Sequence, residues 1–369
     1  MMVRTCRGPH QQVVQSDEMS QRSFRVVWAI PILIAAMACA ASQSLQAHLQ
    51  PSPPSTQTPT SPCPSAYQVG YLVARFNNVK AAVWYPSATT ETSFNYSSQI
   101  TSSLAKDGEP LTGCGTFPLV IFSHGLLGCG DQSIFFTETL ARHGYVVVAP
   151  DYKDALLCSV DGTASTFSSS TQEPPILDPS TWNDNSYVDR KEYTENVLDG
   201  VLQDQRLNPI INVNAIGIAG HSLGGYTALA MVGGWPSWKD DRFKAALLMS
   251  PYSLPFSINN TLKGVTVPLM YQGAELDVGI TPFLEGNQGA YAQSNPPKYF
   301  VKLRGGSHFT WTNAVCAKEP VVADCVQSKP EAGLIDAYGI AFFDEYLKGS
   351  SQPLLTSPNL DLSKYLDQP

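Results

Sequence analysis

Residues 216–225 read IGIAGHSLGG. The first four residues, Ile216 to Ala219, form the short apolar run that is typical of a buried parallel strand. The remaining six contain the G-x-S-x-G pattern of a nucleophile elbow, in which a serine stands on a sharp turn between a strand and a helix. An apolar helical pattern follows, so the strand–turn–helix context of the motif is complete. This context predicts Ser222 as a catalytic nucleophile.

Short apolar runs alternate with helical patterns on both sides of this elbow. The expected strands are 69–76, 79–84, 119–122, 146–149, 216–219, 245–249, 267–271 and 299–303, and the expected helices are 134–142, 190–207 and 332–348. This alternation predicts an α/β domain with about eight strands in a mostly parallel sheet flanked by helices. Sites on such sheets lie beyond the carboxyl ends of the strands.

A serine becomes nucleophilic only beside a base that takes its proton, and the base needs a carboxylate to orient it. In chains with this elbow the order is serine, acid, histidine. His308 is the only histidine after Ser222, and it stands in the loop GGSHF (residues 305–309) after an expected strand. After the preceding strand, Asp277 is the carboxylate that fits best and Glu275 is its rival. The sequence therefore predicts a Ser222, His308 and Asp277 triad.

The oxyanion formed during acyl transfer needs backbone N–H donors. Leu223, the residue after the nucleophile, is expected to supply one donor, and the loop after the third strand the other. That loop reads SHGLLG (residues 123–128), and Leu126 is the expected donor. We interpret both remaining histidines near the site as structural. His124 shapes this loop, and the elbow directs the side chain of His221 away from the serine.

Two aromatic residues near the expected strand ends, Tyr152 and Trp311, are predicted to contact the substrate. For Phe309, burial in the core is an equally good interpretation. The insertion 155–185 is rich in Ser, Thr and Pro, with too few large apolar residues at helical spacing to form an amphipathic lid helix. We therefore expect an open cleft, and a preference for short or medium acyl chains or extended polymeric esters over long-chain triglycerides.

The amino-terminal region is typical of a targeting segment. Arg22 and Arg25 precede an apolar run, residues 26–41, and small residues suitable for cleavage follow. The run is shorter than the roughly 20 residues of a membrane span, so an uncleaved anchor is the lesser alternative. The expected organisation is a signal peptide (1–47), a disordered linker (48–64), a catalytic domain (65–349) and a C-terminal tail (350–369). We expect a secreted or periplasmic protein without a stable membrane partner after cleavage.

Six cysteines follow the expected cleavage site, and an exported chain meets an oxidising environment, so disulfides are expected. The expected pairs are Cys316–Cys325, Cys129–Cys158 and Cys63–Cys114. Cys316 and Cys325 are close in sequence. Cys129 and Cys158 follow the third and fourth expected strands, so both should lie at the edge of the sheet that carries the site. Cys63 and Cys114 are the two cysteines that remain. The sequence has no CxxC pair with the spacing of metal ligands, so no metal site is expected.

The composition is that of a globular protein, with 43% hydrophobic and 15% charged residues. The formal net charge is −8, and no basic run marks a nucleic-acid surface. Nucleic acid is therefore excluded as an expected partner, which leaves small-molecule or polymeric substrates.

The motifs at 124–126 (HGL), 220–225 (GHSLGG), Asp277 and 306–309 (GSHF) together resemble the dienelactone-hydrolase-like branch of the α/β-hydrolases. Within that branch they are most similar to platelet-activating-factor acetylhydrolases and cutinase-type polyester hydrolases. The resemblance spans roughly residues 65–349. It implies the α/β-hydrolase fold and ester hydrolysis through an acyl-enzyme, without a cofactor, on short- or medium-chain, acetyl-phospholipid-like or polyester substrates.

Two other functions compete with this hypothesis. A catalytically inactive binding protein on the same scaffold should lack a triad member, and none is missing here. A serine peptidase would use the same reacting groups, but on this fold it usually carries an extra domain, for which we expect no room.

Overall fold

The computed structural model describes residues 63–96, 99–158, 160 and 173–369. The expected signal peptide (1–47) and all but the end of the expected linker (48–64) lie outside the described residues. The middle of the insertion expected at 155–185 lies outside them as well.

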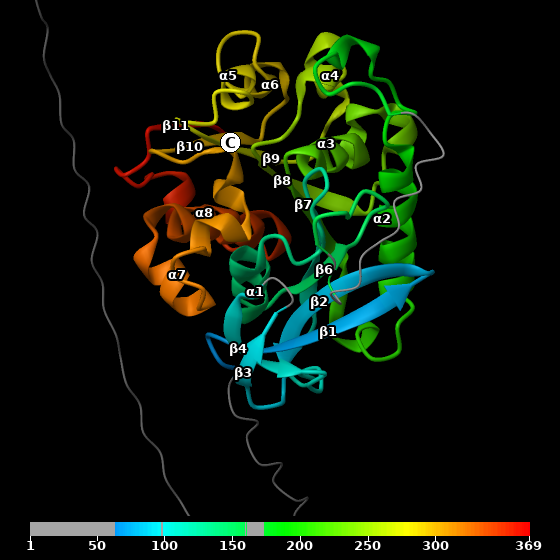
Figure 1. Cartoon of the computed structure of the whole chain (residues 1–369), viewed down its shortest axis with the longest axis vertical. Helices are drawn as coiled ribbons and strands as arrows, with labels where there is room; N and C mark the ends of the chain where they lie inside the picture. The colour runs from blue at the N-terminus through cyan, green and yellow to red at the C-terminus, as the bar shows by residue number, and fades with distance from the viewer. Residues whose placement is uncertain (1–62, 97–98, 159, 161–172) are drawn as a thin grey trace, which may run out of the picture. The chain divides into compact units, whose positions relative to one another are not determined.

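The described strands form one sheet in the order β11-β10-β9-β8-β7-β5-β6-β2-β1-β4-β3. Figure 1 labels these strands except β5. Their bounds are β1 (Gln68–Phe76), β2 (Val79–Ser87), β3 (Thr92–Asn95), β4 (Thr101–Lys106), β5 (Phe117–Ser123), β6 (Val146–Pro150), β7 (Ile211–His221), β8 (Phe243–Met249), β9 (Leu269–Ala274), β10 (Lys298–Leu303) and β11 (Lys364–Gln368). The strands from β6 through β5, β7, β8 and β9 to β10 are parallel to one another. The predicted α/β class and the mostly parallel centre of the sheet are confirmed.

The sequence pattern missed three short strands, β3, β4 and β11. β3 and β11 form the two edges of the sheet, and β4 lies between β3 and β1. β11 pairs antiparallel with β10, from Lys364 opposite Lys302 to Gln368 opposite Lys298. Residues 350–369, expected to be a tail beyond the domain, therefore complete one edge of its sheet. None of the β11 residues is fully buried, so no apolar run marks this strand in the sequence.

Helices cover both faces of the sheet (Figure 1). Their bounds are α1 (Ile134–Arg142), α2 (Val188–Val201), α3 (Leu223–Leu229), α4 (Leu254–Ile258), α5 (Thr281–Leu284), α6 (Ala290–Gln293), α7 (Val322–Ser328) and α8 (Pro330–Leu347). Alternate side chains of a strand point to opposite faces. Along β5, Leu119 and Ile121 pack in the core shared with α2 and α3, whereas Val120 and Phe122 pack with α1 and α8.

All three expected disulfides are present and are therefore confirmed: Cys63–Cys114, Cys129–Cys158 and Cys316–Cys325. Among the described helices, none is both long and apolar enough to cross a membrane.

Candidate active site

The turn between β7 and α3 holds Ser222 in a backbone conformation with φ of 55°, which few non-glycine residues adopt. Two glycines make this turn sterically accessible. A Cβ atom on Gly220 would lie 2.2 Å from the carbonyl oxygen of Gly224, and one on Gly224 would lie 1.9 Å from that of Ser123. Side chains at these positions would therefore force the turn open, which explains the glycines of the motif.

Two loops at the same edge of the sheet bring an imidazole and a carboxylate to this serine. His308, after β10, lies with Nε2 2.9 Å from Ser222 Oγ. Its Nδ1 lies 3.2 and 3.3 Å from the two carboxylate oxygens of Asp277, which follows β9 and is buried. Glu275 is exposed and accepts hydrogen bonds from Ser363 Oγ and the Gly305 N–H. The fold therefore places Asp277, and not Glu275, beside the imidazole.

Ser250 is a third residue at the imidazole, and sequence reasoning missed it. Its hydroxyl donates to Asp277 Oδ2, and its Oγ lies 3.0 Å from His308 Nδ1. Ser250 is fully buried and directly follows β8, between the strands that carry the nucleophile and the acid. The rule that sites follow parallel strands could have suggested this position, but no motif marks the serine.

The loop that follows β5 is held by buried groups. The Gly125 carbonyl accepts hydrogen bonds from His124 Nδ1 at 2.7 Å, from the Gly128 N–H at 3.1 Å and from the Arg190 guanidinium at 3.2 Å. In a trans peptide the carbonyl and the next N–H point in opposite directions. The Leu126 N–H therefore points away from this cluster, and Leu126 lines the same cleft as Ser222.

The other expected donor, Leu223, is the first residue of α3. N–H groups in the first turn of a helix have no partner within the helix. The elbow thus presents this N–H directly after Ser222. Burial, together with the charge of Arg190, lowers the pKa of His124 to about 4, so its ring is neutral at pH 7 and shapes the loop through Nδ1–H.

Ser222 and His308 lie in a cleft of 960 Å³. Five of its lining residues are large apolar side chains that are mostly exposed to solvent: Leu157, Leu177, Leu276, Val278 and Phe309. The described parts of the insertion contribute to this wall, and they contain only one short helical turn, Pro179–Thr181. The part of the cleft that the described residues line is therefore apolar and exposed to solvent.

The two predicted substrate contacts are wrong, because both side chains are buried away from the cleft lining. The Tyr152 ring packs on the guanidinium of Arg190 at 4.4 Å, and its hydroxyl hydrogen-bonds Thr194. Trp311 donates from Nε1 to Gln272 Oε1 at 2.8 Å. Buried Tyr and Trp side chains keep a polar partner, and here the core supplies it. Phe309, which is 65% exposed, borders the cleft instead.

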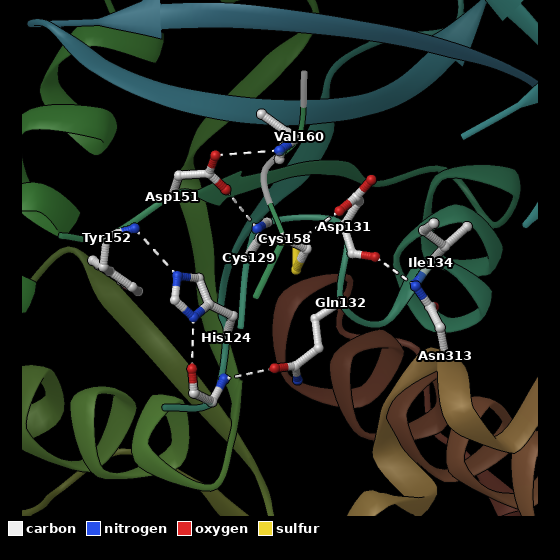
Figure 2. The surroundings of a disulfide bond; sticks show 12 residues. His124, Cys129, Asp131, Gln132, Ile134, Asp151, Tyr152, Cys158, Val160 and Asn313 are labelled. Carbon is white, nitrogen blue, oxygen red and sulfur yellow. Dashed lines mark hydrogen bonds between the residues drawn. A yellow bond between two sulfur atoms is a disulfide. The ribbon is translucent and has the colours of Figure 1, made fainter. Parts of the chain in front are cut away.

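Within the described residues, one group of three potential metal-ligating side chains lies close together: Cys129, Asp131 and Cys158 (Figure 2). Both cysteines form a disulfide. Because a thiolate is the form of cysteine that binds metals, this cluster does not fit a metal ion while the bond is intact.

Comparison with known proteins agrees with this architecture. Among solved structures, a ferulic acid esterase from Streptomyces cinnamoneus superposes with a TM-score of 0.60 at 20% identity, over 84% of this chain and 98% of that one. The two proteins therefore share the α/β-hydrolase fold.

The curated relatives match this chain over only part of their length. Platelet-activating factor acetylhydrolase of Cavia porcellus is 22% identical over 281 residues, which are 66% of this chain and 60% of the relative. Cutinase est1 of Thermobifida alba is 24% identical over 198 residues, 53% of this chain and 54% of the relative. The chain thus spans a little over half the length of these relatives.

The family model described as platelet-activating factor acetylhydrolase, isoform II, matches residues 81–175 and 185–275. These two stretches make up just over half of the chain and include both the loop at Leu126 and the elbow at Ser222. The chain therefore belongs to the platelet-activating factor acetylhydrolase isoform II family.

Proposed function

We propose that this protein is a serine carboxylic-ester hydrolase that works through an acyl-enzyme on Ser222. One observation carries the proposal: Ser222 Oγ, His308 Nε2, His308 Nδ1 and the Asp277 carboxylate form a hydrogen-bonded series in the apolar cleft that the described residues line. The family and the names of the relatives, which are acetylhydrolases and esterases, agree with this reaction.

In the proposed reaction, His308 takes the proton of Ser222 as Oγ attacks the ester carbonyl. Asp277 holds the imidazole in the tautomer with the proton on Nδ1 and stabilises the imidazolium. The alcohol leaves with the proton from His308, and the acyl group stays on Ser222. A water molecule, deprotonated by His308, then releases the acid and restores the serine.

The Leu126 and Leu223 N–H groups would bind the negative charge that develops on the carbonyl oxygen. Support comes from the fixed peptide before Leu126 and from the position of Leu223 at the start of α3. Donors that are already oriented stabilise a transition state without reorganising during the reaction.

The cleft favours substrates with an apolar part near the ester. Leu276, Val278 and Phe309 border the catalytic groups and are more than half exposed. We propose that the enzyme accepts short or medium acyl chains, or an extended polymer chain laid across the open cleft, in preference to long-chain triglycerides. The relatives named as cutinases and as an acetylhydrolase agree with this class.

We also propose export to the cell exterior or the periplasm. All three disulfides of the described chain suit an oxidising compartment. The amino-terminal apolar run preceded by arginines is the sequence feature that would direct it there.

The test of the proposed reaction is Ser222→Ala, assayed on a series of p-nitrophenyl esters of increasing acyl length. Turnover should fall by about 10⁴- to 10⁶-fold, because loss of the nucleophile removes the covalent route. An organophosphonate should label the wild type once, at Ser222, and should not label the variant. Ser357→Ala, at an exposed serine after α8, is the matched control and should keep full activity. Equal turnover by wild type and Ser222→Ala would refute the proposal.

A further inference from the structure

One glutamine connects the oxyanion loop to the loop that carries the base. Gln132, which Figure 2 labels, lies in the turn before α1. Its Oε1 accepts the Gly125 N–H at 3.0 Å, and its Nε2 lies 3.1 Å from His221 Nδ1. The opposite ring atom, His221 Nε2, lies 2.8 Å from the carbonyl oxygen of His308.

The direction of each hydrogen bond in this series is determined by chemistry. An amide nitrogen only donates, so His221 Nδ1 must accept from Gln132. In the neutral ring the proton is then on Nε2, which donates to the His308 carbonyl. If the amide were flipped, its NH₂ group would face the Gly125 N–H, which is also a donor. The proton of His221 would then be on Nδ1, and the bare Nε2 would face the His308 carbonyl oxygen, which is also an acceptor. A single amide orientation and a single tautomer therefore satisfy all three bonds.

Burial keeps His221 in this neutral state. The side chain is 3% exposed. Burial, aided by the neighbouring His308, lowers the pKa of His221 to about 3. Protonation of Nδ1 would turn the acceptor of the Gln132 bond into a donor and break the series, so a low pKa preserves it across the neutral range.

The two ends of the series are the two parts of the site that must hold their geometry during the reaction. At one end, Gly125 is held on its N–H by Gln132 and on its carbonyl by His124, which fixes the peptide that presents the Leu126 N–H. At the other end, the bond from His221 holds the backbone of His308 itself.

We infer that Gln132 and His221 are positioning residues that hold the oxyanion donor and the catalytic base at a fixed separation across Ser222. The inference rests on the proposed function, because it assigns roles in the same hydrolysis. Neither residue reacts: Gln132 acts through Gly125 and His221, and His221 acts through the backbone of His308. A misplacement of about 1 Å in a reacting group can cost roughly 100-fold in rate.

The decisive variant is Gln132→Met, which keeps the side-chain length and removes both hydrogen-bonding atoms. The kcat for a soluble p-nitrophenyl ester should fall by about 10- to 100-fold, with KM within about twofold of wild type. The inhibition constant of a boronic acid that adds to Ser222 should rise by a similar factor, because its tetrahedral adduct needs the same fixed donors. Gln203→Met, at an exposed glutamine after α2, is the matched control and should behave as wild type.

A double-mutant cycle separates a connected series from two independent supports. His221→Phe keeps a ring of similar shape and removes the donor to the His308 carbonyl. If the series acts as a unit, Gln132→Met should add less than threefold to the loss that His221→Phe already causes. Losses that multiply, or a Gln132→Met enzyme with kcat within twofold of wild type, would overturn the inference.

Nitrogen NMR of the histidine rings tests the series without any turnover. In the wild type, His221 should be neutral at pH 6 with the proton on Nε2, and Gln132→Met should move the Nδ1 resonance. A His221 that carries its proton on Nδ1 would overturn the inference, even if Ser222-dependent hydrolysis is found. A wild-type protein with this tautomer but no Ser222-dependent hydrolysis would instead refute the proposed function and, with it, the catalytic role of the series.

Discussion

Ser250→Ala should slow ester hydrolysis even though Ser250 does not touch the ester. The Ser250 hydroxyl donates to Asp277, and its Oγ is 3.0 Å from His308 Nδ1, while the Asp277 oxygens are 3.2 and 3.3 Å from the same nitrogen. The serine is thus as close to the imidazole as the acid is. Removing it leaves Asp277 with one fewer donor and His308 with one fewer acceptor.

The size of the effect follows from the charge involved. A hydrogen bond to a charged group contributes about 1.5–3 kcal/mol. Since about 1.4 kcal/mol corresponds to a tenfold change in rate, full use of this bond in the transition state predicts a kcat lower by roughly 10- to 100-fold. KM should change little, because Ser250 lies beneath the imidazole, does not line the cleft, and is fully buried.

The assay is steady-state hydrolysis of a soluble p-nitrophenyl ester, with unfolding measured in parallel. Ser253→Ala is the matched control, since its hydroxyl is also buried, three residues away, and has no hydrogen-bond partner within the described structure. In an Asp277→Asn background, Ser250→Ala should lose most of its effect, because the amide no longer carries the charge. A Ser250→Ala enzyme within twofold of wild type, or a full additional loss in the Asp277→Asn background, would refute this reasoning.

Three further predictions concern stability. In the wild type, the Asp154 carboxylate lies 2.7 Å from the Arg190 guanidinium. Arg190→Leu removes this cation and leaves the carboxylate buried and unpaired, so the free energy of unfolding should fall by about 3–5 kcal/mol in urea titrations. A loss below about 1 kcal/mol would contradict this. The folded-state pKa values of His124 and His221, about 4 and 3, lie below the value near 6.5 of an unfolded chain. The contribution of these two neutral rings to the free energy of unfolding is therefore fully present above pH 6.5 and should fall as the pH drops toward 4. Urea midpoints that stay constant from pH 7 to pH 4.5 would argue against buried neutral rings. Burial raises the pKa of the Asp336 carboxyl well above its ordinary value, so the folded protein loses stability as the pH rises through that raised pKa. Asp336→Asn removes the ionisable group and should therefore stabilise the protein more at pH 8 than at pH 5. An equal effect at the two pH values would show that the carboxyl does not titrate between them.

The central fold was predictable because its signals are local. Runs such as Val146–Pro150 are buried on both faces of the sheet, so every residue is apolar or small and the strand is visible in the sequence. The edge strands lack this constraint. β11 is stabilised by pairing with β10, far away in the sequence, and its residues Lys364–Gln368 follow no apolar pattern.

The same distinction applies to the candidate site. The elbow at Ser222 could be read directly, since glycines at 220 and 224 are required by steric contacts within the turn and with the adjacent loop. His308 followed from chain order, as the single histidine after the serine. The choice of Asp277 over Glu275 agrees with its position in the structure, where it is buried beside the imidazole and its rival is exposed.

What the tertiary structure alone decided is which side chains meet across long sequence separations. Gln132 and His221 are 89 residues apart, and Ser250 and His308 are 58 apart, yet each pair is in hydrogen-bonding contact. Conversely, Tyr152 and Trp311 follow strands at the site-bearing edge, but both rings are in the core. A sequence pattern specifies the period of a strand and the shape of a tight turn, because these depend on neighbouring residues. The direction in which a loop side chain points depends on packing partners from distant segments, and only the folded chain brings those together.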